Sequence, residues 1–432
     1  MVESGQAKPF TGTETEAVEQ LDRLLREVVR LQMVADVPLG AFLSGGIDSS
    51  TVVALMQAQS RRPVKTFTIG FGEAEYNEAN HSRAVAKHLG TDHTELQVTP
   101  ADALNVIPKL PFIFDEPFAD SSQIPTYLVS QLAARSVTVS LSGDGGDELF
   151  GGYSWYFQSR DMWNKLRHLP KPLRRLTSAA LRTVSAQNWN RILPVLRPLL
   201  SGRVTGDRIH KFAALLRESN RPESVYRSLM TRWNGASPIV RGATEPLTVL
   251  TDEAAWPKFG GLIDRAMYVD AMTYLPDNNL AKVDRASMAV GLESRAPLLD
   301  HRVMEFAWRL PSSMKVRGKQ GKWVLRQVLH KYVPPALIER PKMGFCVPID
   351  SWLRGPLIDW AQGLLDEKRL REEGIFDPAP IRQKWREHQT GVRNWQHHLW
   401  CVLMFQAWLE AEQAGSPPSP RAAIPVRRSV AS

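Results

Sequence analysis

Two short stretches of this sequence combine glycines with serines and aspartates, a composition that suits phosphate binding. The first stretch is Ser44-Gly45-Gly46-Ile47-Asp48-Ser49-Ser50. The second stretch is Ser142-Gly143-Asp144-Gly145-Gly146-Asp147-Glu148. Glycines let the backbone approach a ligand closely, and the unpaired N–H groups at the start of a helix attract anions. A plain capped turn needs only one such side chain, so we interpret both stretches as parts of a binding site.

The carboxylate of Asp48 indicates a divalent cation at the first stretch. This stretch lacks the Gly-Lys-Ser/Thr ending of a Walker A loop, so it has no lysine for a β- or γ-phosphate. A carboxylate beside a polyphosphate is repulsive unless a divalent cation lies between them. We therefore predict that Mg²⁺ bridges Asp48 and pyrophosphate oxygens.

The segments around the two stretches alternate between strand and helix patterns. Apolar, β-rich runs predict strands at residues 39–43, 64–71, 93–98 and 137–141. Helical spacing predicts helices at residues 48–57, 78–89 and 124–135, and Thr13 with Glu16 forms a capping box before another helix. The alternation predicts an α/β fold with a doubly wound parallel sheet. Ligands bind at the carboxyl ends of the strands in such sheets, so the two stretches should face each other.

The second half of the chain has a largely helical pattern, and its first part is strongly basic. Twelve Lys and Arg residues but only two Asp lie between Arg160 and Lys211, so this segment accounts for the net charge of +9. Leucines and tryptophans interleave with the arginines. We interpret the segment as a solvated helical face over an apolar one, in preference to an RNA, membrane or acidic-partner surface. An apolar helix is predicted at residues 395–409.

Composition excludes several classes of protein. The chain has 432 residues, 43% of them hydrophobic and 23% charged, which is ordinary for a soluble globular protein. It contains no run of about 18 apolar residues and no signal-peptide core, so we expect a cytoplasmic protein without a membrane partner. The two cysteines, Cys346 and Cys401, are too few for a disulfide framework or a cysteine-rich metal site.

The first stretch resembles the pyrophosphate loop of the ATP pyrophosphatases. Its surroundings, from about Pro9 to about Glu412, resemble the synthetase domain of the asparagine synthetase family. The resemblance implies a sheet of the adenine nucleotide alpha hydrolase type and cleavage of ATP to AMP and pyrophosphate. The implied ATP-binding residues are Leu43, Ser44, Gly45, Gly46, Asp48, Ser49, Ser50, Ile69, Ser142 and Gly143.

The resemblance also assigns roles to charged residues. Asp144 matches the acidic residue that acts in forming the acyl-adenylate, and Asp147 shares the Mg²⁺–pyrophosphate with Asp48. Lys342 would ordinarily be taken for an exposed loop lysine, but it matches the family's Lys-x-Gly-Phe motif, which makes it the cation that balances phosphate charge. Charged residues at 276–300 look from their spacing like surface pairs. By resemblance they approach the acyl-acceptor end of the site.

The implied reaction is activation of a carboxylate followed by amide formation, which gives asparagine if the substrates are aspartate and ammonia. Family members of full length begin with a glutaminase domain whose nucleophile is an N-terminal cysteine. This chain begins Met1-Val2 and has no cysteine before Cys346, so we expect free ammonia or ammonia from a separate glutaminase.

Two alternatives to aspartate amidation stay open. Some aspartate-using relatives carry an arginine where residues 118–127 of this chain have serines, so another carboxylate, on a surface sugar, a peptide or a secondary metabolite, is the first alternative. A non-catalytic nucleotide-binding or scaffold protein is the second, and intact Asp48, Asp144, Asp147 and Lys342 argue against it. Relatives that close β-lactams have Tyr at the position of Asp144, which disfavours that chemistry.

The motifs predict one synthetase domain over residues 13–412. Within it we expect a nucleotide-binding α/β core at 13–158, a basic helical segment at 159–260 and a helical part at 261–412 that completes the site. Residues 1–12 are predicted to be a tail or linker stump and residues 413–432 a disordered tail. The expected partners are small molecules, with no nucleic acid, and a homodimer is one open alternative for the assembly.

Overall fold

The computed structural model describes residues 2–71, 79–196, 204–233, 239–252, 254, 256–339 and 347–415. The chain forms two compact units. The first comprises Met1–Asp115, Asp120–Tyr153 and Val249–Val347, and the second comprises Glu116–Ala119, Ser154–Thr248 and Pro348–Ser432. The functional division of residues 13–412 drawn from the motifs stays a prediction.

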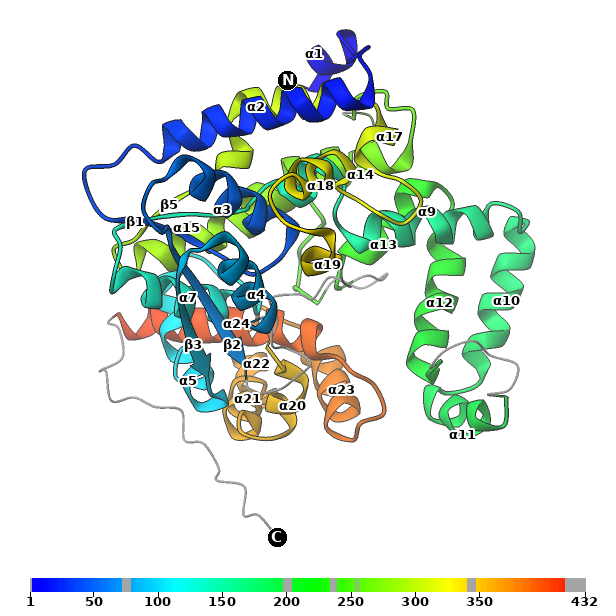
Figure 1. Ribbon diagram of the computed structural model, residues 1–432. Helices are drawn as coiled ribbons and strands as arrows, with labels where there is room; N and C mark the ends of the chain where they lie inside the picture. The colour runs from blue at the N-terminus through cyan, green and yellow to red at the C-terminus, as the bar shows by residue number, and fades with distance from the viewer. Residues whose placement is uncertain are drawn as a thin grey trace. The chain divides into compact units, whose positions relative to one another are not determined.

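The first unit is built on a parallel sheet, as the sequence predicted. Its strands are β1 (Leu39–Phe42), β2 (Lys65–Phe71), β3 (Asp92–Val98), β4 (Val139–Leu141) and β5 (Glu293–Arg295). All neighbouring pairs are parallel, in the order β3-β2-β1-β4-β5. Figure 1 labels β1, β2, β3 and β5 of this sheet. β5 was not predicted, because its three residues are polar. It joins the sheet through its backbone, and the N–H of Ser142 donates to the Arg295 carbonyl at 2.8 Å.

Helices surround this sheet. The helices of the first unit are α1 (Val2–Ala7), α2 (Glu14–Gln32), α3 (Ile47–Gln59), α4 (Ala79–Leu89), α5 (Pro100–Leu104), α6 (Leu110–Ile113), α7 (Gln123–Ala134), α8 (Gly146–Phe150), α14 (Leu262–Met272), α15 (Ala281–Met288), α16 (His301–Arg309), α17 (Ser312–Lys315), α18 (Trp323–His330) and α19 (Pro335–Ile338). The predicted capping box starts α2, since Glu16 N–H donates to Thr13 Oγ1 and Thr13 N–H donates to Glu16 Oε2. Residues 2–7, expected to belong to a tail, form α1 instead.

One apolar core holds these layers together. It includes Leu21 and Leu25 of α2, Val53 of α3 and Leu325 of α18, all buried. The helices therefore pack through the faces that their apolar spacing predicts. This packing fixes the carboxyl ends of β1 and β4, where the two glycine-rich stretches begin.

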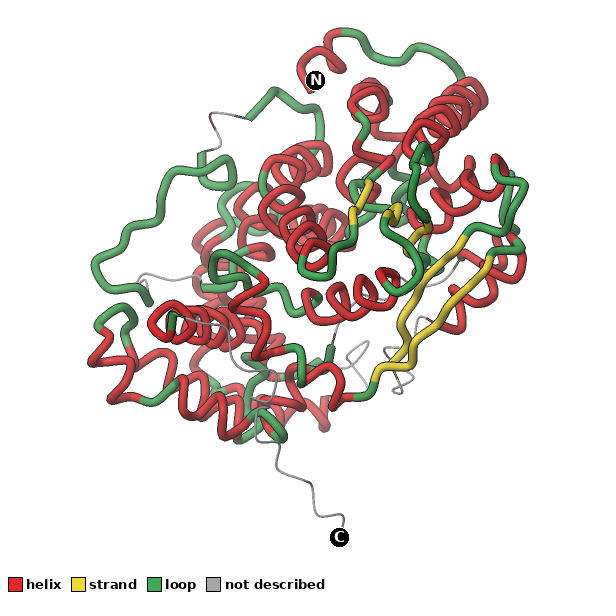
Figure 2. The backbone as a smooth tube through the Cα atoms, turned by 90° about the vertical axis from the view of Figure 1, so that its left-hand side faces the viewer, coloured by secondary structure: helices red, strands yellow, loops and turns green. Residues whose placement is uncertain are grey.

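The second unit is helical in its described residues, and Figure 2 shows helix as the prevailing element of the chain. Its helices are α9 (Ser154–Leu166), α10 (Lys171–Thr183), α11 (Ala186–Leu196), α12 (Gly206–Glu218), α13 (Pro222–Met230), α20 (Ile349–Arg354), α21 (Ile358–Leu364), α22 (Glu367–Glu373), α23 (Pro378–Gln389) and α24 (Gln396–Ala414). α24 confirms the apolar helix predicted at residues 395–409, except that Trp395 is its N-cap. No helix in the described parts of the chain is long and apolar enough to cross a membrane.

The interpretation of the basic segment as a charged face over an apolar one is wrong for α10. Leu173 and Leu176 are 46% and 68% exposed, whereas Arg174 is buried. The guanidinium of Arg174 donates to the carbonyls of Leu169 and Ser219 at 2.8 and 2.6 Å. α10 packs on α12 through this polar face, because the backbone carbonyls there can accept the arginine's hydrogen bonds.

Candidate active site

The first glycine-rich stretch connects β1 to α3 and is closed by serine hydroxyls. Ser44 Oγ and Ser49 Oγ lie 3.0 Å apart, and the N–H of Ser44 donates to Ser49 Oγ at 3.2 Å. Gly45 has a φ of 70°, and a Cβ there would lie 2.8 Å from the Ser82 nitrogen. Gly46 caps α3 without a side-chain hydrogen bond. The turn therefore places the positive end of the α3 dipole beside the backbone of the stretch.

The second stretch follows β4 and lies directly against the first. β1 and β4 are parallel neighbours, so their carboxyl ends share one edge of the sheet. A Cβ at Gly143 would lie 2.6 Å from the Ser49 nitrogen and 2.8 Å from the Cβ of Asp48. A Cβ at Gly146 would overlap the carboxylate of Asp48. The structure thus brings the two stretches together, and glycine is required where they touch.

A lysine that the sequence analysis did not single out joins the two stretches. The ammonium of Lys322 pairs with the carboxylate of Asp48 and, at 2.8 Å, with Oδ1 of Asp147. Only 7% of its side chain is exposed. Burial lowers the pKa of Lys322, but the charges of Asp147 and Asp48 outweigh burial and raise it. Lys322 therefore stays protonated and holds both carboxylates around one positive charge.

The backbone at Lys322 is strained. Its φ is 60°, in the left-handed region, and it is the only non-glycine residue with a positive φ in the described part of the chain. The N–H of Lys322 donates to the Phe150 carbonyl at 2.8 Å, and its side chain passes where a Cβ on Gly152 would lie. Strain of this kind persists mainly at functional sites. The feature of the sequence that could have pointed to Lys322 is its position between Gly321 and the start of an apolar helix.

Asp144 lies in the second stretch, three residues before Asp147. The hydroxyl of Ser142 donates to its Oδ2 at 2.7 Å. Burial raises the pKa of Asp144, while the hydrogen bond from Ser142 and the charge of Lys282 lower it. Groups whose pKa is perturbed by burial and by specific charges are frequent at reactive sites. The surroundings of Asp144 therefore suit a residue that acts on charge during a reaction.

A second ion pair joins Asp120 and Lys282. Lys282 Nζ lies 2.9 Å from Asp120 Oδ2 and donates to Ser122 Oγ at 2.8 Å. The amide of Asn278 donates to the same Asp120 oxygen at 2.8 Å. Burial raises the pKa of Asp120, but the charge of Lys282 and the hydrogen bonds from Lys282, Ser122 and Asn278 together outweigh burial and lower it. Lys282 Nζ also donates to Asn279 Oδ1 at 3.4 Å, and the amide of Asn279 donates to Glu148 in the second stretch, so hydrogen bonds join the pair to that stretch.

A π-helical segment, η5 (Leu275–Leu280), links this pair to a buried carboxyl. It carries Asn279 next to Asn278, and the amide of Asn279 donates to Glu148 Oε1 and Tyr153 Oη at 2.8 Å each. The Tyr153 hydroxyl also donates to Glu148 at 2.8 Å. Burial and the charge of Asp147 raise the pKa of Glu148 to about 7. π-Helical turns are frequently found at functional sites.

Comparison with known proteins decides the family. The family model described as asparagine synthase matches residues 20–410. The chain belongs to the asparagine synthase family.

Individual relatives agree with this family match. The chain is 32% identical over 407 residues to a protein of Mycobacterium tuberculosis that is assigned as a glutamine-hydrolysing asparagine synthetase; the match covers 93% of this chain and 59% of the relative. Asparagine synthetase 1 of Bacillus subtilis is 29% identical over 403 residues, which cover 93% of this chain and 60% of the relative. The chain therefore spans about three fifths of the length of these relatives.

The apolar residues that the asparagine synthase family would place beside adenine lie at two neighbouring strands, one just after β1 and one within β2. Leu43 follows β1 and donates its N–H to the Phe67 carbonyl of β2 at 2.9 Å, and Ile69 lies farther along β2. Both side chains are buried, as is Ser50 on α3. The expected contact with adenine would therefore be made by backbone atoms. Their assignment to ATP stays a prediction.

The charged family signature at 276–300 divides into two groups in the structure. The side chain of Lys282 is only 12% exposed and pairs with Asp120, so the interpretation as a surface pair is wrong for that residue. Arg285 does form surface pairs, at 3.0 Å with Asp115 and 3.3 Å with Asp284. The other motif residue, Lys342, lies outside the described residues, and its role stays a prediction.

The donors at the two stretches fit the Mg²⁺ that the asparagine synthase family generally uses with ATP. Asp48 and Asp147 already converge on a single cation, the ammonium of Lys322. No cluster of three or more His, Cys, Asp or Glu side chains suited to a metal occurs among the described residues. Mg²⁺ is commonly bound by one or two carboxylates together with substrate phosphates and water. Two carboxylates are thus sufficient for such an ion.

Proposed function

We propose that this chain is an ATP-dependent amide-forming ligase that activates aspartate as β-aspartyl-AMP, releases diphosphate and forms asparagine from ammonia. The observation that carries the proposal is the convergence of Asp48, Asp147 and Lys322 between two glycine-rich stretches, with Asp144 alongside. Carboxylates and a buried ammonium at one sheet edge suit a polyphosphate whose charge must be compensated as it departs.

The phosphate end of the proposed site consists of backbone N–H groups and charged side chains. The N-terminus of α3 favours an anion, and Lys322 lies where it can donate to the departing pyrophosphate. Asp48 and Asp147 would hold Mg²⁺, which neutralises phosphate charge when bound. We infer that Lys342 supplies a further positive charge, as the family motif implies. Catalysis of phosphoryl and nucleotidyl transfer is mostly positioning and electrostatic stabilisation of this kind.

The reaction proceeds in two steps. A carboxylate oxygen of the substrate attacks the α-phosphorus of ATP, and the bond from that phosphorus to pyrophosphate breaks. Ammonia then attacks the acyl carbon, AMP leaves with the electron pair of the acyl–oxygen bond, and a proton is lost from nitrogen. Asp144 lies beside the phosphate end, and the charge of Lys282 lowers its pKa. We therefore assign Asp144 to orienting the substrate carboxylate while charge develops on it.

Lys282 supports aspartate as the substrate. The serines at 121 and 122 leave that segment without the arginine of some aspartate-using relatives. Ser122 Oγ nevertheless contacts the ammonium of Lys282 at 2.8 Å, so another element brings a positive charge to the same place. A cation there suits a substrate with a second carboxylate. The remaining alternative is a different small carboxylate, since the pair Asp120–Lys282 is neutral as a whole.

The deciding experiment is ATP–pyrophosphate exchange with a panel of carboxylates and Mg²⁺. We expect exchange that depends on aspartate, with AMP and diphosphate as the direct products by ³¹P NMR. Formation of ADP and orthophosphate would refute the proposed reaction. Exchange with another carboxylate but not with aspartate would retain the ligase and replace its substrate. Succinate and glutamate are suitable controls, since they lack the amino group and have an extra methylene respectively.

A further inference from the structure

A cavity in the first unit lies apart from the two glycine-rich stretches. It has a volume of about 330 Å³ and is formed by α1, the end of α16, α17 and the start of α14. None of its lining residues belongs to residues 44–50 or 142–148. We propose that this cavity is a second ligand site, for a small organic anion with a flat apolar body. The proposal does not depend on the proposed function.

Lys315 is the residue that would bind the anionic group. It is 2% exposed and lines the cavity. Its one ion-pair or hydrogen-bond partner among the described residues is Asp264, whose Oδ1 lies 3.4 Å from Nζ. An ammonium group can donate three hydrogen bonds, and a buried charge is costly unless it is fully paired. Lys315 therefore has donors left for an anionic ligand.

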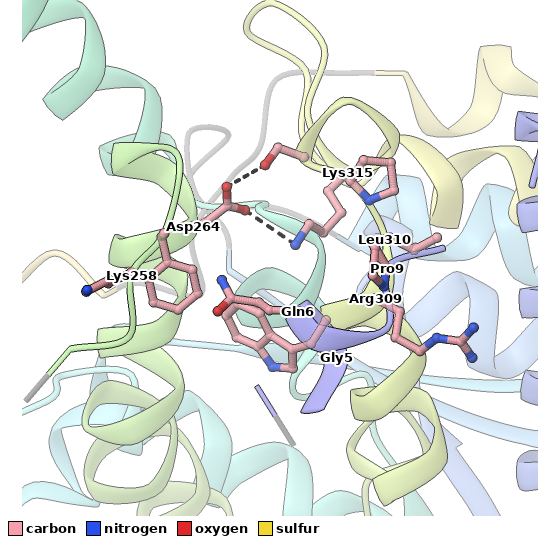
Figure 3. Close-up of a pocket in the computed structure, with 12 residues that line it drawn as sticks. Gly5, Gln6, Pro9, Lys258, Asp264, Arg309, Leu310 and Lys315 are labelled. Carbon is pink, nitrogen blue, oxygen red and sulfur yellow. Dashed lines mark hydrogen bonds and ion pairs between the residues drawn. The ribbon is translucent and has the colours of Figure 1, made fainter. Parts of the chain in front are cut away.

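Asp264 does not neutralise the cavity. Figure 3 shows its carboxylate pointing toward Lys315, with one oxygen bonded to the Ser312 hydroxyl and the other to the lysine. Lys258 and Arg309 also line the cavity, but Figure 3 shows their charged ends directed away from Lys315, so the ammonium of Lys315 is the positive group that faces the cavity. Burial lowers the pKa of Lys315, and the charge of Asp264 opposes this effect. The lining as a whole has three basic side chains and one acidic side chain, a balance that favours an anion over a cation.

Aromatic side chains would bind the body of the ligand. Trp308 and Phe259 line the cavity, with ring centroids 5.9 Å apart and planes tilted by 38°. The ammonium of Lys315 lies 5.1 Å from the Trp308 ring centroid, so the charge sits directly beside the aromatic surface. A cavity with apolar walls and a few convergent polar groups is the usual form of a small-molecule site. The walls and the lysine together suit an aromatic carboxylate or a similar anion.

The test is a ligand-observed NMR titration of the full chain with benzoate and its uncharged analogue benzamide. We expect benzoate to bind with a dissociation constant near or below about 1 mM, as the efficiency of small ligands allows, and benzamide to bind at least about tenfold more weakly. Lys315→Met should weaken benzoate binding at least tenfold, to about the level of benzamide. Lys331→Met, which removes a surface pair with Asp22, is the matched control and should bind as the wild type does.

A second variant keeps the proposal testable if Lys315→Met does not fold. Gln6 is exposed at the cavity, so Gln6→Trp adds bulk there without entering the core. We expect Gln6→Trp to keep the wild-type circular dichroism spectrum and to weaken benzoate binding at least tenfold. The proposal fails if benzoate does not bind the wild type, if benzamide binds equally well, or if binding persists in Gln6→Trp. Persistence in that variant would place the benzoate elsewhere, for example at the carboxylate-substrate site.

Discussion

Among single residues, Lys322 balances the charge where the two glycine-rich stretches meet. It compensates Asp48 and Asp147 at once, and its left-handed backbone is held by a hydrogen bond to Phe150. Without the lysine, two carboxylates would repel each other in a poorly solvated place. The same lysine is suited to phosphate charge when ATP is bound. Its contribution can be separated from that of Mg²⁺ by substitution.

Lys322→Met should lower kcat for adenylation by about 10²-fold or more, as expected for a group that stabilises transition-state charge. It should also lower the midpoint of thermal unfolding, because the carboxylates of Asp48 and Asp147 lose their counter-charge. Added Mg²⁺ should then raise the unfolding midpoint of the variant more than that of the wild type. Equal Mg²⁺ effects on both proteins would contradict the shared cation position. Lys331→Met is again the control.

Asp144→Asn and Lys342→Ala should each lower kcat by about 10²-fold or more while the fold stays intact, as expected for groups that act mainly on transition-state charge. Steady-state kinetics with the accepted carboxylate and a circular dichroism spectrum of each variant provide the measurement. Near-normal turnover in either variant would remove that residue from the mechanism. An intact fold is expected for Asp144→Asn because the amide can still accept the hydrogen bond from Ser142.

Glu148 should make stability depend on pH. Its pKa is raised from 4.5 to about 7 in the folded chain, so folding favours the protonated form. The contribution of protonated Glu148 to the free energy of unfolding is fully present below pH 4.5. It declines as the pH rises toward 7 and is absent above that value. The free energy of unfolding of the wild type should fall by roughly 3 kcal/mol relative to Glu148→Gln across this window.

Urea unfolding at several pH values between 4.5 and 8 measures this difference. Glu19→Gln, on an exposed position of α2, should keep the pH profile of the wild type. Parallel profiles for the wild type and Glu148→Gln would show that the carboxyl does not titrate as its burial requires.

At the level of elements, the site depends on two turns that meet because β1 and β4 are adjacent and parallel. The contact leaves no room for side chains at Gly143 and Gly146. η5 adds a third element, and its π-helical winding presents Asn278 and Asn279 to neighbouring carboxyl groups. These three elements fix the charged groups before any ligand binds. Such preorganisation lowers the cost of arranging charges during reaction.

Gly143→Ala should impair both stability and activity. The new Cβ would lie 2.6 Å from the Ser49 nitrogen, so the two turns must separate. We expect a loss of about 1–3 kcal/mol in the free energy of unfolding and a larger proportional loss of ATP binding. Chemical unfolding and nucleotide titration are the measurements. Gly363→Ala, where a Cβ has open space, should be neutral or slightly stabilising, and equal effects of both substitutions would contradict the close contact.

At the scale of the whole molecule, every described residue that we assign to the site lies in the first compact unit. The second unit carries the basic helices, and we assign none of its described residues to the proposed chemistry. Its cysteine, Cys401, is partly buried, and burial raises the pKa of its thiol. A thiol with a raised pKa is a poor nucleophile at neutral pH.

We expect the chain as given to use ammonium and not glutamine as nitrogen donor. With ATP, Mg²⁺ and aspartate, ammonium should support formation of asparagine, and glutamine alone should not, because hydrolysis of glutamine needs an activated nucleophile. The measurement is chromatographic detection of asparagine and glutamate. Release of glutamate from glutamine by the purified chain would refute the expectation. Addition of a separate glutaminase should restore the use of glutamine.

The sequence by itself determined the parallel α/β sheet, the strand–turn–helix form of residues 44–50 and a second glycine-rich turn at a matching strand end. These features are local, since they follow from apolar periodicity and from the special backbone of glycine. The tertiary structure alone decided that Lys322 would reach Asp48 across 274 positions of sequence. It also placed β5 in the sheet and buried Arg174 in place of two leucines. These long-range contacts depend on which polar groups can form hydrogen bonds when helices and strands pack. The spacing of residues along the chain does not contain this information.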